Sequence, residues 1–196
     1  MILPRQSLTA DEFAEIRPDL PEGGRWHELH NGKPVLLEAP DDAHGTTVLN
    51  ISRALGIWFQ QNRDQPRGYA CYGPGLVAGQ NPDTVFLPSL MYFDEGPVFG
   101  QSDLPLATLV PKLVVDVAST NDRRRLMRER TIAYLKLGVE VVWVPDPFKM
   151  EVQVVRRIGP TLALGKRQSL DCPELLPKFS MPVADVFAQP KWWTGS

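Results

Sequence analysis

The stretch that decides the fold is residues 111–147, PKLVVDVASTNDRRRLMRERTIAYLKLGVEVVWVPDP. Its first part, residues 112–118, is an apolar, β-branched run typical of a strand buried on both faces. Turn-forming residues follow, and then an Arg-rich helix to Leu137, with Gly138 as its C-terminal cap. A second β-branched run covers residues 139–144. Strand, helix and strand joined by short connections predict two parallel strands with a right-handed crossover.

Two charged side chains in this unit need an explanation. Asp116 lies within the apolar strand, where an unpaired carboxylate is costly to desolvate. One face of the helix carries residues spaced i, i+3, i+7 and i+10, namely Met127, Arg130, Tyr134 and Leu137. Arg130 is therefore expected to point toward the sheet. Asp116 and Arg130 form either a structural ion pair or two members of a site.

The other arginines of this helix are expected on its flanks, facing water. They are Arg123, Arg124, Arg125 and Arg128. Such a cluster is either a solvated helix face or a surface that contacts nucleic-acid phosphates.

The composition is that of one globular domain spanning residues 1–196. The chain has 196 residues, 43% of them hydrophobic, and a formal net charge of −2. It therefore lacks a global basic signature for nucleic acid, although a local groove can still be basic. Cys71 and Cys172 are far apart, which predicts no disulfide framework and a cytoplasmic protein. No apolar run reaches membrane-spanning length, so no membrane association is expected.

Local patterns predict the remaining elements. A capping box opens a short helix at residues 9–17, and Asn31-Gly32 marks a β-hairpin. Expected further along are a long helix over 41–63, strands over 67–72, 76–78 and 84–87, an irregular segment over 88–109, an antiparallel pair over 150–157 and 161–164, and a helical turn over 183–187.

Two aspartates suggest a metal-dependent site. Phosphodiester cleavage needs a hard divalent ion held by oxygen ligands. Asp83 opens a predicted strand, and we expect that strand to pair with the strand that carries Asp116. Arg130 could neutralise charge that develops at the phosphate. The alternative for Asp83 is a turn residue at the start of a strand.

The order of several motifs resembles the Uma-two family of the PD-(D/E)XK restriction-endonuclease-like superfamily. The motifs are HELHNGK (27–33), a helix opening near His44, NPDTVFLP (81–88), PKLVVDVAST (111–120) and AYLKLGVEVVWVPDP (133–147). The resemblance covers about residues 22–187. It implies an α/β core, with a central mixed sheet flanked by helices and an N-terminal β-hairpin. It also implies a DNA endonuclease dependent on Mg²⁺ or Mn²⁺, of a fold that often forms homodimers.

The resemblance assigns site residues one by one. Asp83 matches the Pro-Asp acid and Asp116 the second acid, so both are expected metal ligands. Arg130 matches the family's lysine, which lies four residues before the tyrosine. Glu28 and His44 match a recurring glutamate of the hairpin and a recurring histidine at the start of the long helix.

Two departures from the family pattern bear on activity. Asp116 stands where the family usually has glutamate, which shortens the reach of the carboxylate by one methylene. Arg130 keeps the positive charge of the lysine but stays protonated and cannot act as a general base. The alternative function is therefore a catalytically weakened nuclease fold that binds nucleic acid or protein. A third alternative is a structural protein without nucleic-acid affinity.

Overall fold

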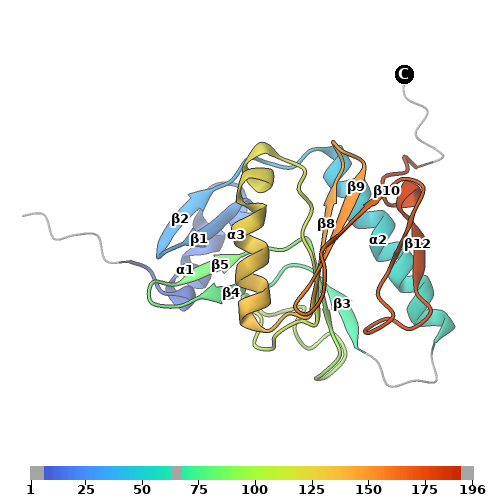
Figure 1. The fold of residues 1–196 in the computed structure, drawn as a ribbon. Coiled ribbons are helices and arrows are strands. Elements are labelled where there is room, and N and C mark those ends of the chain that lie inside the picture. Colours follow the sequence, from blue (N-terminus) through green and yellow to red (C-terminus); the bar gives the residue numbers. More distant parts are fainter. Residues whose placement is uncertain (1–6, 63–67, 191–196) are drawn as a thin grey trace, which may run out of the picture.

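The structure is a computed structural model that describes residues 7–62 and 68–190. It contains a six-stranded sheet with helices on both faces and a smaller sheet beside α3 (Figure 1). The elements are α1 (Ala10–Ile16), η1 (Arg17–Asp19), η2 (Pro21–Gly24), β1 (His27–His30), β2 (Lys33–Leu36), α2 (Asp42–Gln61), β3 (Tyr69–Cys71), β4 (Leu76–Gly79), β5 (Thr84–Phe86), β6 (Leu90–Phe93), β7 (Leu113–Val115), α3 (Asn121–Leu137), β8 (Val141–Asp146), β9 (Glu151–Arg156), β10 (Leu162–Gly165), β11 (Ser169–Asp171), β12 (Ser180–Pro182) and α4 (Val183–Val186).

The strand–helix–strand unit has the predicted form. Strands β7 and β8 pair in parallel, and α3 connects them. The Thr120 hydroxyl accepts a hydrogen bond from the backbone N–H of Arg123 and caps the start of α3. Gly138 ends the helix with φ 116°, a left-handed conformation that glycine adopts without steric cost. The cap residues and the two β-branched runs therefore predicted the strand–helix–strand unit correctly from the sequence.

The order of the large sheet is β10-β9-β8-β7-β6-β3, and that of the small sheet is β2-β1-β5-β4. Apart from β7 and β8, neighbouring strands of the large sheet run antiparallel. The sheet is therefore mixed, as expected. Helix α2 and the C-terminal segment cover one face, and α3 with the small sheet covers the other.

The predicted N-terminal elements are also present. Thr9 and Glu12 form the capping box of α1, and Asp41 caps α2 through the backbone N–H of His44. Asn31 and Gly32 both have positive φ, the conformation that a two-residue hairpin turn requires. None of the helices within the described ranges is long and apolar enough to cross a membrane.

The expectation of an irregular segment over 88–109 is wrong at its beginning. Strand β6 (Leu90–Phe93) lies in the large sheet between β7 and the edge strand β3. All four of its side chains are buried, so its sequence shows no alternation of polar and apolar residues. Strand β7 pairs with β6 and β8, and β5 belongs to the small sheet, so β5 and β7 are not neighbours. This arrangement changes the candidate site.

Candidate functional site

Asp116 directly follows β7 and points toward α3. Its backbone N–H donates to the carbonyl oxygen of Trp143 at 3.0 Å, which continues the pairing with β8. Side chains alternate along a strand, and Val114 belongs to the core on the α3 side of the sheet. Asp116 shares that side and is 0% exposed. An acid in this position needs buried partners.

Arg130 of α3 is the central partner of this acid. It is 0% exposed, which confirms that it points inward. Its Nε donates to Asp116 Oδ2 at 2.7 Å, its Nη1 forms an ion pair with Glu28 Oε2, and its Nη2 donates to the Tyr134 hydroxyl at 3.1 Å. That hydroxyl in turn donates to Asp116 Oδ2 at 2.7 Å. The guanidinium also lies over the Phe86 ring, 4.5 Å from its centroid.

Arg123 joins the same cluster, so the expectation that it faces water is wrong. The residue is 5% exposed, and its Nη1 donates to Asp116 Oδ1 at 3.1 Å. Arg123, Met127, Arg130 and Tyr134 are spaced i, i+4, i+7 and i+11, which is one face of a helix. That spacing was the sequence signal for its burial. Two arginines now balance two carboxylates, and the cluster is neutral.

The electrostatics favour the ionised carboxylates. Burial opposes ionisation of Glu28, but the Arg130 guanidinium and the His30 ring outweigh burial and hold its pKa at about 2. Burial also disfavours the charged form of Arg130, yet Asp116 and Glu28 raise its pKa well above the ordinary value. Burial raises the pKa of Tyr134, which therefore stays a neutral hydrogen-bond donor. We refer to Glu28, Asp116, Arg123, Arg130 and Tyr134 as the ionic cluster.

His44 lies at the edge of the ionic cluster, in the first turn of α2. Its Nδ1 is 2.8 Å from the Ser119 hydroxyl oxygen. Burial and the nearby Arg123 guanidinium lower the pKa of His44 to about 4, so the ring is neutral at neutral pH. This position agrees with local hydrogen bonding by the ring.

Asp83 does not join the ionic cluster. It precedes β5, which pairs with β1 and β4 in the small sheet, so the expected pairing with the strand of Asp116 is wrong. Its carboxylate accepts hydrogen bonds from the backbone N–H groups of Ala10, at 2.8 Å, and Asn81, at 3.3 Å. These contacts fasten α1 to the small sheet and give Asp83 a structural role.

Ser89 is the residue that faces Asp116 from the neighbouring strand. Leu90 pairs with Val115 in the antiparallel register of β6 and β7, which places Ser89 opposite Asp116. Met91 packs on the α3 side of the sheet, and alternation puts Ser89 on that side too. The Ser89 hydroxyl accepts a hydrogen bond from the backbone N–H of Val117 at 3.1 Å. An acid contributed by the neighbouring strand would stand at this position. The sequence-based prediction missed it because it missed β6.

The side chains of this centre, as arranged, do not fit Mg²⁺ or Mn²⁺. Such ions need several carboxylate or carbonyl oxygens that are free to coordinate. Both oxygens of Asp116 accept hydrogen bonds from side chains of the ionic cluster, and those of Glu28 are bound by Leu87 N–H, Arg130 and His30. Within residues 7–62 and 68–190, no group of three or more His, Cys, Asp or Glu side chains is placed to hold a metal. Arg130 supplies the positive charge instead.

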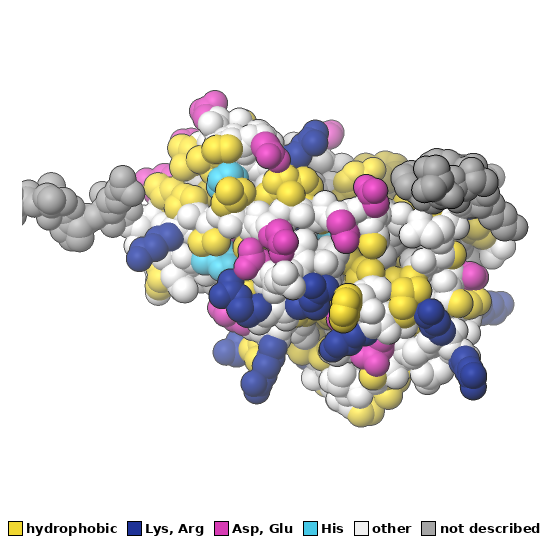
Figure 2. Space-filling view, turned by 90° about the horizontal axis from the view of Figure 1, so that it is seen from above, with side chains coloured by type: hydrophobic (Ala, Val, Ile, Leu, Met, Phe, Trp, Pro, Cys, Tyr) yellow, Lys and Arg dark blue, Asp and Glu magenta, His cyan; other side chains and the backbone are white. Residues whose placement is uncertain are grey.

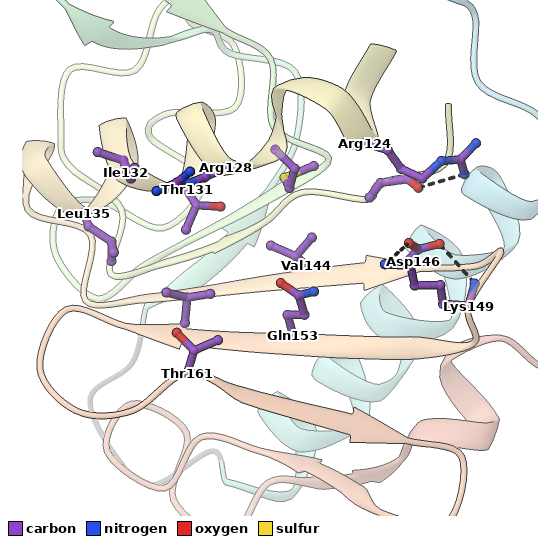
Figure 3. Close-up of a pocket in the computed structure, with 13 residues that line it drawn as sticks. Arg124, Arg128, Thr131, Ile132, Leu135, Val144, Asp146, Lys149, Gln153 and Thr161 are labelled. Carbon is purple, nitrogen blue, oxygen red and sulfur yellow. Dashed lines mark hydrogen bonds and ion pairs between the residues drawn. The ribbon is translucent and has the colours of Figure 1, made fainter. Parts of the chain in front are cut away.

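A second feature is a trough between α3 and strands β8 and β9, with a volume of about 420 Å³. Its floor includes the apolar residues Met127 and Val144. Arg124, Arg128 and Lys149 carry the positive charge of its rim. Figure 3 shows Arg124 and Lys149 at one end of the trough and Arg128 farther along the helix. We call this feature the α3–β9 trough.

Comparison with known proteins places the chain among nuclease-like proteins. The Uma2 family model, described as "Putative restriction endonuclease", matches residues 10–184. The chain is also similar to the crystal structure of a "putative nuclease belonging to DUF820" from Anabaena variabilis ATCC 29413, with a TM-score of 0.72 and 18% sequence identity. That similarity covers 92% of this chain and 97% of the other and supports the fold. No curated protein matches.

We expect Glu28→Gln to destabilise the protein at neutral pH by roughly 3–5 kcal/mol, because it leaves two buried guanidiniums, Arg123 and Arg130, with the single carboxylate of Asp116. The pKa of Glu28 falls from 4.5 to about 2 on folding, so its contribution to stability is present above pH 4.5 and is lost as the pH falls toward 2. Urea unfolding at a series of pH values measures both effects. Equal stability of the variant and the wild type at pH 7 would show that the ion pair contributes nothing.

For Asp83→Ala we expect a loss of about 1 kcal/mol, because α1 loses a hydrogen-bond acceptor at its first turn. Thermal unfolding measures this loss, and the pH dependence that Glu28 gives the wild type should remain in the variant. A changed pH dependence would mean that Asp83 is coupled to the ionic cluster after all.

Proposed function

Because the chain belongs to the Uma2 family of restriction-endonuclease-like proteins, we propose that it is a nuclease-fold protein that binds nucleic acid without hydrolysing it. One observation carries this proposal. Asp116 is 0% exposed, and the side chains of Arg123, Arg130 and Tyr134 already occupy both of its carboxylate oxygens. The acid that would bind an ion or activate water is instead part of a neutral, buried cluster.

Arg130 does not replace the chemistry of a metal ion in this arrangement. A guanidinium can bind a phosphate through two parallel hydrogen bonds, but all three nitrogens of Arg130 already donate to partners within the protein. It also remains protonated and cannot accept a proton from water. Arg130 therefore supports the fold and does not contact a substrate.

The second candidate function is a DNA endonuclease dependent on Mg²⁺ or Mn²⁺, with Asp116, Glu28 and Arg130 in the active site. The convergence of these three residues favours it. Under this alternative the ionic cluster must open, because a divalent ion has to displace Arg130 from Asp116. The sequence at this position is Pro88-Ser89. With serine in place of aspartate, the ion would have one carboxylate ligand fewer.

Incubation of the protein with supercoiled plasmid distinguishes the two functions. We expect a shift of the plasmid on a gel and no nicked or linear product with either Mg²⁺ or Mn²⁺. We also expect that Mn²⁺ leaves the melting temperature unchanged, because the carboxylates are not free to bind it. Cleavage that Asp116→Ala abolishes and Asp83→Ala leaves intact would establish the endonuclease instead. A protein that shifts no nucleic acid even at low salt would contradict both functions.

A matched variant tests the explanation based on Ser89 and Arg130. Ser89→Asp combined with Arg130→Lys supplies a second acid opposite Asp116 and removes the guanidinium that blocks it. In this double variant we expect Mn²⁺ to raise the melting temperature, whereas Arg130→Lys alone should not respond. A response of equal size in the wild type would show that the native donor set already holds the ion.

A further inference from the structure

We propose that the α3–β9 trough binds single-stranded nucleic acid, with phosphates on its cationic rim and a base on the exposed ring of Phe148. The inference rests on the proposed function, since it assumes that the protein binds nucleic acid, and it names the surface and the strand state. The trough lies beside the exposed flank of α3, whereas the ionic cluster lies beneath the inner face of that helix.

The rim carries three cations, whereas one acid, Asp146, lines the trough, so positive charge is in excess there. Arg124 donates to the backbone carbonyls of Ala118, at 3.4 Å, and Ser119, at 3.3 Å, so neutral acceptors hold its guanidinium in place. Arg128 is exposed and forms no ion pair with the described part of the chain. On the face of the molecule drawn in Figure 2, several Lys and Arg side chains gather toward the lower side, with a few acidic side chains among them.

Lys149 and Asp146 form the end of the trough at the turn between β8 and β9. The Asp146 side chain accepts hydrogen bonds from the backbone N–H groups of Phe148, at 3.0 Å, and Lys149, at 3.1 Å. Both bonds go to Oδ1 and fix the turn, and Asp146 is the one acid among the residues that line the trough. The Lys149 ammonium is 4.0 Å from Asp146 and more than half exposed, so it remains available to an anion. Three cations against one acid leave a net positive charge along the trough, which favours a polyanion.

Phe148 lies next to this end of the trough, beside Lys149 in the chain and against the Arg124 side chain, and offers an aromatic surface there. Its side chain is 82% exposed, and the Arg124 guanidinium lies 5.4 Å from the ring centroid. An exposed aromatic ring beside arginine is a stacking platform for unpaired bases, since every base presents a π-face. A duplex keeps its bases stacked inside and cannot offer one to Phe148. The size of the trough, about 420 Å³, also suits individual nucleotides.

The test uses a fluorescein-labelled oligothymidylate and fluorescence anisotropy at several salt concentrations. Replacing Arg124, Arg128 and Lys149 together by alanine should weaken binding at low salt at least ~10-fold. It should also flatten the salt dependence by about 0.7 for each phosphate that is no longer neutralised, or about 2 in total. The matched control replaces Arg25, Lys33 and Arg53, three exposed cations outside the trough, and removes the same charge. Equal losses of affinity in the two triple variants would overturn the proposal.

A second variant guards against misfolding of the first. Arg128→Glu with Lys149→Glu leaves the Arg124 contacts in place and should weaken binding at least as strongly, with an unchanged circular dichroism spectrum. Wild-type affinity in this variant would overturn the proposed surface. The closed ionic cluster and the absence of cleavage would then still stand, because the plasmid assay tests them separately.

Phe148→Ala tests the strand state. Removal of one stacked base should weaken binding of the oligothymidylate roughly fivefold or more and leave the affinity for a duplex of equal length unchanged. The wild type should prefer the single strand. If the wild type binds the duplex more tightly than the single strand, or if Phe148→Ala has no effect, the proposal is overturned. The trough would then contact only the phosphate backbone of the nucleic acid.

Discussion

The rest of the structure depends on a buried guanidinium shared by two carboxylates. Arg130 of α3 binds Asp116 at the end of β7 and Glu28 of β1, so one side chain joins the helix to both sheets. Arg123 adds a second contact from the same helix. A buried charge pair contributes little net stability compared with apolar packing, but an unpaired member is costly. The position of α3 against the small sheet is therefore specified by charge as well as by packing.

The same neutrality determines the chemistry that is available. A hard metal ion requires an excess of negative charge and oxygen atoms with free lone pairs. In this centre two carboxylates meet two guanidiniums, and a phenol donates to one of the acids. Ser89 stands where the next strand could have supplied a further acid. The fold of a nuclease is thus retained around a centre whose charges are already balanced.

Much of this architecture could be predicted from local sequence. Periodicity and turn chemistry gave the hairpin, α2, α3 and the parallel pair of β7 and β8, and helical spacing gave the inward direction of Arg130. The pairing between strands was harder to predict than the elements themselves, because a residue pattern along the chain does not show which strands are neighbours in a sheet. The short strand β6 is wholly buried, so its sequence lacks the alternation of polar and apolar residues that identifies a half-exposed strand. The Pro-Asp acid was therefore placed at Asp83, whereas the strand beside Asp116 begins after Pro88 and Ser89.

The closed centre and the cationic trough are physically compatible on one helix. Unbalanced carboxylates beneath α3 would create a negative potential and repel phosphates from its exposed flank. Pairing with Arg123 and Arg130 cancels that potential, so the charges that line the trough are those of Arg124, Arg128, Lys149 and Asp146. Arg123 and Arg130 thus neutralise Asp116 and Glu28, while Arg124 and Arg128 form no ion pair with these two acids. Under the proposed function, a nuclease fold whose buried acids are paired with arginines can therefore still attract a nucleic-acid strand.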